Sequence, residues 1–400
     1  MNITGIITEY NPFHNGHLYH LSTAKKVTNC DAIVCIMSGN FVQRGEPAII
    51  DKWKRAEMAL LNGVDLIIEL PTFYAVSSAE FFAKGAINIL DRLGVVNNIF
   101  FGSECGDIDL LYKIARILTN EPKDLKLKIK ENLKSGITYA KAREKALIDI
   151  LNEDSLNEVL SNSNNILGIE YIKAIIKCNS NINPLTMKRE GSKYNDKKLS
   201  TIFSSATSIR ENIKNGFNLN SLEPYMPSPS LEILKSLANN NYPFIFEENM
   251  YRYIKYRLLT NCINFNNLFE VKEGIDNKFI KEIYNSSSYE DLILKAKSKR
   301  YTYTKISRLL CQLFFSLDNY NFNELLQDDN LYARVLGFND KGRQILKEMK
   351  KKSTIPIITK VPKNIDNKLL QLDIQCTKAY SILNHKVNPL SDYLLSPIIK

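Results

Sequence analysis

Continuous apolar segments alternate with amphipathic ones through the first hundred residues, and this alternation constrains the fold more than any other feature. Four apolar runs have the length and β-branched content of buried strands, at residues 3–7, 32–37, 64–70 and 95–101. Helical spacing of apolar residues separates these runs, at residues 16–27, 52–61 and 78–93. Strands that are apolar throughout are buried on both faces, which predicts a doubly wound parallel sheet of the α/β class.

The place of a ligand site follows from this sheet. Open α/β sheets bind ligands beyond the carboxyl ends of their strands. The site is therefore expected among the loops that begin there, at residues 8–16, 38–47, 71–77 and 102–106.

The second half of the chain has a different pattern. Another strand is predicted at residues 182–187, but the α/β character ends near Pro224. Everything from residue 230 onward has the spacing of helices joined by polar loops. We predict two domains, an α/β domain over residues 1–220 and a mostly helical domain over residues 221–400.

Charge is unevenly divided between these halves. The chain has 53 Lys and Arg against 43 Asp and Glu, a net charge of +10. Residues 1–200 hold 25 against 23 and residues 201–400 hold 28 against 20, so +8 of the surplus lies in the second half. This excess favours a polyanionic partner there, with a solvated basic surface as the alternative.

Several classes of protein are disfavoured. No apolar run approaches the 18–20 residues of a membrane span, so we expect no membrane association. The N-terminus enters a strand directly, without a signal peptide. Seven cysteines without a C-x-x-C pair are typical of reduced thiols in a cytosolic protein. The sequence does not indicate an oligomeric state.

Three of the four histidines lie in one short segment after the first strand. His14, His17 and His20 follow at three-residue spacing and open the first predicted helix, where free backbone N–H groups favour a phosphate. Gly16 allows a nucleotide to approach the backbone, and His14 and His17 can stabilise charge at a phosphorus centre. A zinc site and simple packing, the latter mainly for His20, are the alternatives, and we expect no metal ligands.

A second polar element is the segment from Phe203 to Arg210. Ser205 and Thr207 precede Arg210 at the start of a predicted helix, and hydroxyls, free N–H groups and a cation suit a triphosphate. Taken alone, this pattern also fits an ordinary helix N-cap. Its weight comes from its pairing with the histidine motif.

Together these motifs resemble the HIGH-type nucleotidyltransferase superfamily. Three longer strings are similar to the bacterial tRNA(Met) cytidine acetate ligase family, at residues 9–17, 37–48 and 164–171. The resemblance extends from residue 1 to about residue 345 and includes Lys299-Arg300-Tyr301-Thr302 with Arg308. It implies a Rossmann-like domain followed by a helical one.

The resemblance also implies an activity. The family activates acetate with ATP as acetyl-adenylate, releasing pyrophosphate. It then transfers the acetyl group to the exocyclic amine of the wobble cytidine of elongator tRNA(Met), giving N4-acetylcytidine. ATP accompanied by Mg²⁺, acetate and elongator tRNA(Met) are therefore the expected cofactors and partners.

The residues implied to bind ATP form one continuous run and several later positions. The run is Ile7, Thr8, Glu9, Tyr10, Asn11, Pro12, Phe13, His14, Asn15, Gly16, His17, Leu18, Tyr19 and His20. The later positions are Gly102, Asn164, Arg189, Ser205 and Thr207, and Asn165 is the alternative to Asn164. We assign the catalytic roles to His14 and His17. For Arg44 and Glu46 we expect a substrate or loop-ordering role, with a surface ion pair as the alternative.

A basic stretch in the second half is the predicted RNA contact. Cations and aromatic rings alternate there, which suits the phosphates and unstacked bases of an RNA loop. The predicted RNA-binding residues are Lys297, Lys299, Arg300, Tyr301, Lys305 and Arg308. Two other functions stay open at this point, an adenylyltransferase for a small phosphorylated metabolite and a non-catalytic RNA-binding protein.

Overall fold

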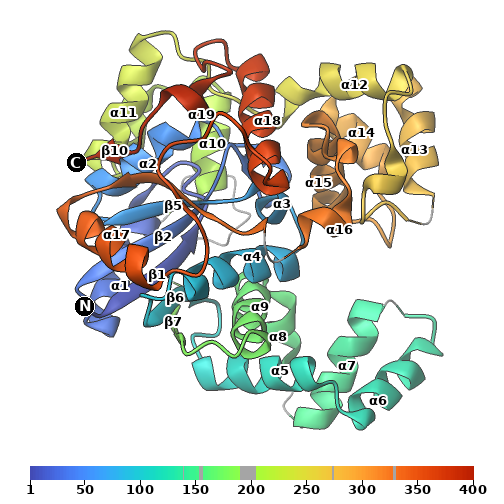
Figure 1. Ribbon diagram of the computed structural model, residues 1–400. Coiled ribbons are helices and arrows are strands. Elements are labelled where there is room, and N and C mark those ends of the chain that lie inside the picture. Colours follow the sequence, from blue (N-terminus) through green and yellow to red (C-terminus); the bar gives the residue numbers. More distant parts are fainter. Residues whose placement is uncertain (138, 153–155, 190–203, 273, 328–329) are drawn as a thin grey trace.

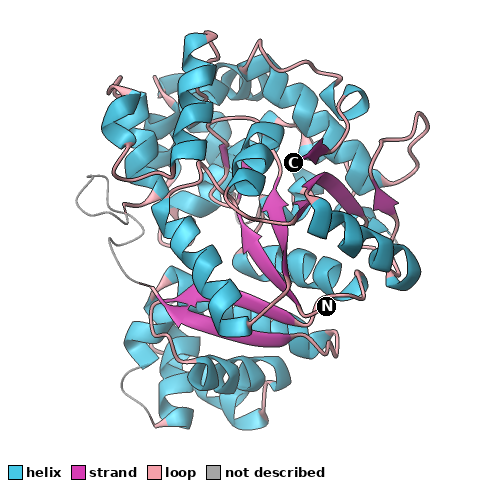
Figure 2. Cartoon of the chain, turned by 90° about the vertical axis from the view of Figure 1, so that its left-hand side faces the viewer, coloured by secondary structure: helices cyan, strands magenta, loops and turns pink. Residues whose placement is uncertain are grey.

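The core of the protein is one eight-stranded, mostly parallel sheet (Figures 1 and 2). The computed structural model describes residues 1–137, 139–152, 156–189, 204–272, 274–327 and 330–400. The sheet order is β10-β8-β5-β2-β1-β6-β7, and β9 pairs with β8 beside this path. The five parallel strands of the first half are β1 (Ile3–Thr8), β2 (Ala32–Ser38), β5 (Leu66–Leu70), β6 (Asn98–Ser103) and β7 (Asn183–Lys188).

Burial explains why these segments are strands. Every residue of β2 and of β5 is buried, as expected for a sheet covered by helices on both faces. The covering helices are α1 (Asn15–Thr28), α2 (Lys52–Leu61), α4 (Ala79–Arg92), α5 (Ile108–Asn120) and α9 (Ser163–Lys177). The short helix α3 (Thr72–Ala75) follows β5, and the hairpin β3 (Phe41–Val42) and β4 (Glu46–Pro47) follows β2. The predicted α/β class is confirmed.

Helices α6 (Lys123–Leu133) and α7 (Tyr139–Leu151) project from this α/β body at the lower right of Figure 1, and α8 (Leu156–Ser161) packs against α7 and α9. Helices α6 and α7 are linked by a hydrogen bond of 3.2 Å from Asn132 Nδ2 to the Ala142 carbonyl.

Residues 206–325 form the helical part of the molecule, which lies along the top and right of Figure 1. Its helices are α10 (Ala206–Lys214), α11 (Ser228–Asn239), α12 (Tyr251–Leu259), α13 (Ile275–Glu282), α14 (Tyr289–Ala296), α15 (Tyr303–Phe314) and α16 (Phe322–Leu325). This region agrees with the predicted helical character.

The last seventy residues return to the sheet, which the sequence pattern did not predict. Strand β8 (Ala333–Phe338) pairs antiparallel with β5, and β9 (Ile357–Ile358) and β10 (Ile398–Ile399) pair with β8. Helices α17 (Asp340–Lys352), α18 (Lys368–Leu383) and α19 (Ser391–Leu394) accompany these strands. Residues 221–400 are therefore not one helical unit, and the prediction of helices throughout that range is wrong for β8–β10.

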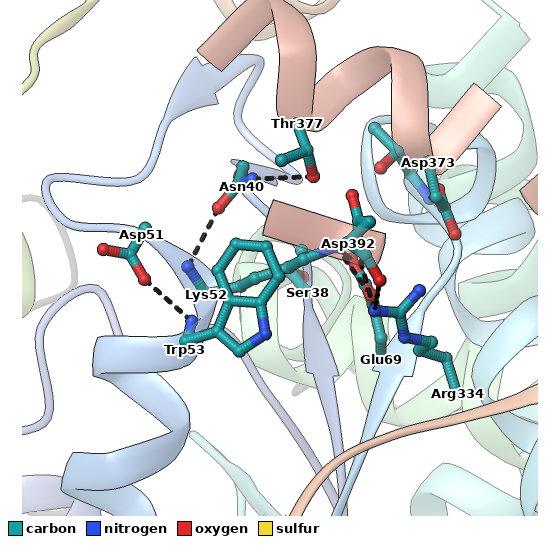
Figure 3. Close-up of polar contacts among 12 residues, drawn as sticks. Ser38, Asn40, Asp51, Lys52, Trp53, Glu69, Arg334, Asp373, Thr377 and Asp392 are labelled. Carbon is teal, nitrogen blue, oxygen red and sulfur yellow. Dashed lines mark hydrogen bonds and ion pairs between the residues drawn. The ribbon is translucent and has the colours of Figure 1, made fainter. Parts of the chain in front are cut away.

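A buried ionic cluster fastens this C-terminal segment to the sheet (Figure 3). Lys52 Nζ lies 2.7 Å from Glu69 and 2.9 Å from Asp392, and Arg334 lies 3.1 Å from the same Asp392 carboxylate. All four side chains are at most 4 % exposed. The cluster is structural, and it joins α2, β5, β8 and α19.

Two further predictions concern the whole chain. All seven cysteines are free thiols, in line with the predicted absence of a disulfide framework. Among the described residues, no helix has both the length and the apolar character needed to cross a membrane.

Candidate active site

One pocket opens at the carboxyl ends of β1, β6 and β7, at the sheet edge where the sequence predicts a ligand site. Its wall combines residues from the first loop, from the strand ends and from the start of α10. The lining residues are Ile7, Thr8, Glu9, Tyr10, Asn11, His14, Gly16, His17, Tyr19, His20, Gln43, Arg44, Phe82, Phe101, Gly102, Asn164, Leu167, Tyr171, Met187, Arg189, Ser204, Ser205, Ala206, Thr207 and Arg210.

Helix α1 fixes the orientation of His14 and His17 through its own N-terminus. His14 is the N-cap, and its Nδ1 accepts the N–H of Gly16 at 3.0 Å. His17 Nδ1 accepts the N–H of His14 at 3.3 Å, and the two rings are 3.8 Å apart. A Cβ at Gly16 would lie 2.8 Å from His14 Cε1, so the close approach of ring and backbone requires glycine here.

These contacts decide which imidazole nitrogen carries the proton. Because each Nδ1 accepts a hydrogen bond, a neutral ring has its hydrogen on Nε2. Burial and the charges of Arg189 and Arg210 lower the pKa of His14 to about 3, and burial and the neighbouring His14 lower the pKa of His17 well below its usual range. Both rings are therefore neutral Nε2–H donors that line the pocket.

His20 lies one helical turn further along the same wall. Its ring is 5.3 Å from the ring of Phe100, and burial, with a smaller effect of Arg189, lowers its pKa to about 4. His20 thus combines the packing role considered for it with a place in the pocket wall. No group of three or more His, Cys, Asp or Glu with the geometry of a metal site occurs among the described residues.

Helix α10 brings a second N-terminus to the pocket. Ser205 is its N-cap and accepts the N–H of Ser208 at 3.1 Å, and Thr207 also lines the wall. Arg210 donates to the carbonyl of Asn11 at 2.9 Å and pairs with Glu46 at 2.9 Å. The histidine and Ser/Thr motifs, nearly two hundred residues apart, are thus brought together, while Phe203 lies outside the described residues.

The opposite end of the pocket is more apolar. Phe101, Leu167, Tyr171 and Met187 line it beside Gly102, the penultimate residue of β6. A Cβ at Gly102 would lie 3.0 Å from Cγ of Arg189, so the glycine leaves room for that side chain.

Of the two candidate residues Asn164 and Asn165, Asn164 is the one that lines the pocket. Asn164 Nδ2 donates to Glu104 at 2.6 Å. Asn165 is buried, and its Oδ1 accepts the N–H of Cys105 at 3.0 Å. Glu104 also accepts the N–H of Asn165 at 2.7 Å and so holds the start of α9 against the end of β6.

Four residues of the predicted ATP-binding run are not part of the pocket wall. Pro12 and Phe13 are buried behind it, and Leu18 is 37 % exposed on another face of α1. Asn15 Nδ2 donates instead to the carbonyl of Pro224 at 2.9 Å. Successive side chains of a helix point in different directions, so the residues of a continuous run cannot all face one ligand.

Gln43, which is outside the predicted set, also lines the wall. Gln43 and Arg44 lie in the turn of the β3–β4 hairpin, and the Gln43 N–H donates to Glu9, which follows β1, at 2.9 Å. Burial raises the pKa of Glu9. Glu46 forms its ion pair with Arg210, which agrees with the loop-ordering role considered for it. Only the proximity of this hairpin to β1 in space reveals Gln43 as a wall residue.

The predicted RNA-binding stretch divides into two groups. Lys297, Lys299 and Arg300 are exposed on the loop between α14 and α15. Lys305 is half-buried, with Nζ 4.2 Å from the ring centre of Tyr301.

Two of the predicted RNA-binding residues, Tyr301 and Arg308, are largely buried and contact other parts of the protein. Tyr301 is 4 % exposed and its hydroxyl bonds to the backbone of Lys272, so the prediction that this ring stacks on a base is wrong. Arg308 is largely buried and lies 3.6 Å from Glu270. Tyr303, 38 % exposed, is the accessible ring of this stretch.

Comparison with known proteins agrees with the geometry. The profile of the HIGH Nucleotidyl Transferase family matches residues 1–392. The tRNA(Met) cytidine acetate ligase of Clostridium novyi is 54 % identical over 399 residues, which cover 100 % of this chain and 99 % of that protein. The Clostridium tetani protein of the same name is 52 % identical, with 100 % of each chain covered.

Solved structures show the same likeness along the whole chain. Apo Thermotoga maritima TmcAL superimposes with a TM-score of 0.91 at 36 % identity, covering 100 % of this chain and 99 % of that one. The same Thermotoga protein bound with alpha-thio ATP gives a TM-score of 0.88 at 35 % identity, with the same coverage. The chain therefore belongs to the tRNA(Met) cytidine acetate ligase family of HIGH nucleotidyl transferases.

Proposed function

We propose that this protein activates acetate with ATP and transfers the acetyl group to the exocyclic amine of the wobble cytidine in elongator tRNA(Met). The observation that carries the proposal is the pair of neutral histidines at the start of α1, which faces the same pocket as the N-terminus of α10. Two helix N-termini and two fixed donors suit a polyphosphate. The likeness to an ATP-analogue complex of Thermotoga maritima TmcAL supports this reading.

In the first step, an acetate oxygen attacks the α-phosphorus of ATP. A new P–O bond forms and the bond between the α-phosphorus and the bridging oxygen breaks, so pyrophosphate leaves with the electron pair. The Nε2–H groups of His14 and His17 donate to the phosphate oxygens on which charge develops. Arg210 and Arg189 add positive charge from two sides of the pocket.

In the second step, the cytidine amine attacks the carbonyl carbon of acetyl-adenylate. The new N–C bond replaces the C–O bond to AMP, and the amine loses one proton. Mixed-anhydride activation supplies the leaving group that acetate lacks, so the enzyme contributes mainly positioning and charge stabilisation.

We infer places for the nucleotide and its metal from the other lining residues of the pocket. The adenosine is expected against Gly102 and Asn164, between the apolar walls of β6 and α9. Glu9 is the one carboxylate among the described lining residues, and its oxygen already accepts the Gln43 N–H. Mg²⁺ would therefore be held mainly by the phosphates and water, as is usual for Mg²⁺ with a nucleotide. We expect the reaction in the cytoplasm.

Transfer of labelled acetate tests the proposal. Purified protein, ATP and ¹⁴C-acetate are incubated with an elongator tRNA(Met) transcript and with the same transcript carrying uridine at the wobble position. Label is expected in the first transcript and absent from the second. Label in neither transcript, with active reference enzyme in parallel, contradicts the proposal.

The exposed cations of the α14–α15 loop are the proposed first RNA contact. Neutralising Lys297, Lys299 and Arg300 together to Gln should weaken tRNA binding and lower the slope of log K against log salt by roughly 2–3, because about one counterion is released per phosphate contact. Filter binding at several salt concentrations measures both quantities. Unchanged affinity and slope would show that the loop is only a solvated basic surface.

A further inference from the structure

Helices α6–α8 form an insertion between two residues of the active-site wall. The chain leaves the pocket at Gly102, forms α5, α6, α7 and α8, and returns to the pocket at Asn164, near the start of α9. A macromolecule whose reacting group enters this pocket therefore meets the base of the insertion at the pocket wall.

Helix α6 carries a stripe of lysines along the outer side of this insertion. Lys123, Lys126, Lys130 and Lys134 recur at intervals of three, four and four residues, which places them on one face of the helix. All four are exposed. The eleven steps along the chain from Lys123 to Lys134 correspond to a stripe about 16 Å long, since an α-helix rises 1.5 Å per residue.

The opposite face of α6 explains why the stripe stays outside. Leu125 and Ile129 are buried, and α7 packs against α6. The apolar face of α6 is thereby buried between α6 and α7, and the lysines on the other face are exposed to solvent.

Most of these lysines lack an intramolecular counter-charge. Lys126 pairs loosely with Glu121 at 3.5 Å, at a site where both side chains are more than half exposed. The side chains of Lys123, Lys130 and Lys134 form no ion pair or hydrogen bond with any part of the chain that the structure describes. Exposed ion pairs contribute little, so three to four positive charges remain available to a polyanion.

We propose that this lysine stripe of α6 is a second tRNA-binding surface, which binds the phosphate backbone next to the nucleotide that enters the pocket. The proposal rests on the proposed function, because that function supplies the RNA. In Figure 1 the stripe's helix and the α12–α15 helices project on the same side of the molecule, the right. A lysine ladder without interleaved exposed rings suits backbone contacts, which position the RNA without reading its sequence.

Chemistry favours RNA over a protein partner at this face. Specific protein interfaces are depleted of lysine at their centres, whereas phosphate contacts use it directly. The apolar side chains exposed on α6, Leu127 and Leu133, are separated in sequence by lysine and glutamate and do not follow one another along the helix.

Binding of an elongator tRNA(Met) transcript, measured by fluorescence anisotropy over a range of KCl concentrations, tests the proposal. The test variant changes Lys123, Lys130 and Lys134 to Gln. A matched control changes three exposed lysines of α17, Lys347, Lys350 and Lys352, to Gln, and this helix lies on the left of the molecule in Figure 1. Acetate-dependent ATP–pyrophosphate exchange, measured without tRNA, checks that both variants keep an intact pocket.

The α6 variant should raise Kd for the transcript on the order of tenfold and lower the salt slope by roughly 2–3, with exchange unchanged and the α17 control like wild type. Wild-type affinity and slope in the α6 variant would overturn the proposal, as would equal losses in both variants. A change in the sedimentation of the α6 variant without RNA, with tRNA binding unaltered, would instead identify the stripe as a protein interface and overturn it too. Absence of acetyl transfer by a wild-type protein that binds the transcript through α6 would count against the proposed function alone.

Discussion

At the scale of single residues, the site depends on how backbone amides use the histidine side chains. Histidine is an uncommon N-cap, yet the His14 side chain caps α1 by accepting the Gly16 N–H. The backbone N–H of His14 in turn donates to Nδ1 of His17. Because Nδ1 of His14 and Nδ1 of His17 both accept backbone hydrogen bonds, the Nε2–H groups of both rings remain to donate to a ligand. The chemistry of the site is thus set by local helix geometry, which is why a short sequence motif can specify it.

The low pKa of His14 leads to a prediction about stability against pH. Its pKa is about 3 in the folded protein and near 6.5 when unfolded, so the unfolded chain binds more protons between these values. The free energy of unfolding should therefore fall as pH is lowered from about 6.5, by up to about 1.4 kcal/mol per pH unit for each such group.

The variant His14→Asn separates this effect from the cap. Asparagine is a good N-cap and can accept the Gly16 N–H, but it does not titrate. Urea unfolding at pH 5.0, 5.75 and 6.5 should give a shallower loss of stability for His14→Asn than for wild type. Equal pH dependence of the two proteins would show that His14 is not held neutral.

The predictions for individual residues failed where contacts with residues distant in the sequence determine whether a side chain is buried. The motif at residues 7–20 correctly indicated His14, His17 and Gly16 as wall residues, because one loop and one helix turn position them. The burial of Tyr301 depends on a bond to Lys272, and that of Arg308 on Glu270. Nothing in the local spacing of residues 297–308 encodes these partners.

At the scale of elements, the pocket is shaped by the contact of α9 with β6. Gly168 lies on α9 against the ring of Phe101, which also packs on Tyr171 at a ring distance of 5.6 Å. A Cβ at position 168 would lie 2.5 Å from Phe101 Cε2, so the helix and the strand could not keep their present separation. The glycine thus sets the position of one pocket wall.

Gly168→Ala is expected to destabilise the protein by about 1–2 kcal/mol, because overpacking costs more than the gain in helix propensity. It should also weaken ATP binding, since Phe101 lines the pocket. Thermal unfolding and equilibrium binding of ATP measure these two effects. The exposed Lys177→Ala on the same helix serves as the control, and a Gly168→Ala protein with wild-type stability and affinity would contradict the assigned packing.

Elements were predictable where periodicity is strong and local. The β1–β6 alternation and the helices around it lie within a few residues of their predicted bounds. Strand β8 was missed although residues 335–338 are apolar, because this segment is short and lies within a region with the pattern of helices. Its place beside β5, more than 260 residues earlier, is a property of the tertiary fold.

At the scale of the whole molecule, the C-terminal segment completes the α/β body. Asp392 supplies the carboxylate shared by Lys52 and Arg334, and all three side chains are almost fully buried. Removing one partner of a buried ion pair leaves an uncompensated charge, which typically costs 3–5 kcal/mol.

Asp392→Asn should therefore lower the free energy of unfolding by about 3–5 kcal/mol. The exposed Asp366→Asn, which leaves the cluster intact, should stay within about 0.5 kcal/mol of wild type. Chemical denaturation of both variants makes the comparison. An Asp392→Asn protein as stable as the control would show that the C-terminal segment is not fastened by this cluster.

The central claim is that the paired histidines of α1 activate acetate with ATP, and ATP–pyrophosphate exchange tests it most directly. Exchange is measured with and without acetate, in the wild type and in His17→Ala. The account predicts exchange that requires acetate and falls by about 10²–10³ in the variant, the usual effect of removing one donor to a developing charge. Exchange that is independent of acetate, or equal in both proteins, would contradict it.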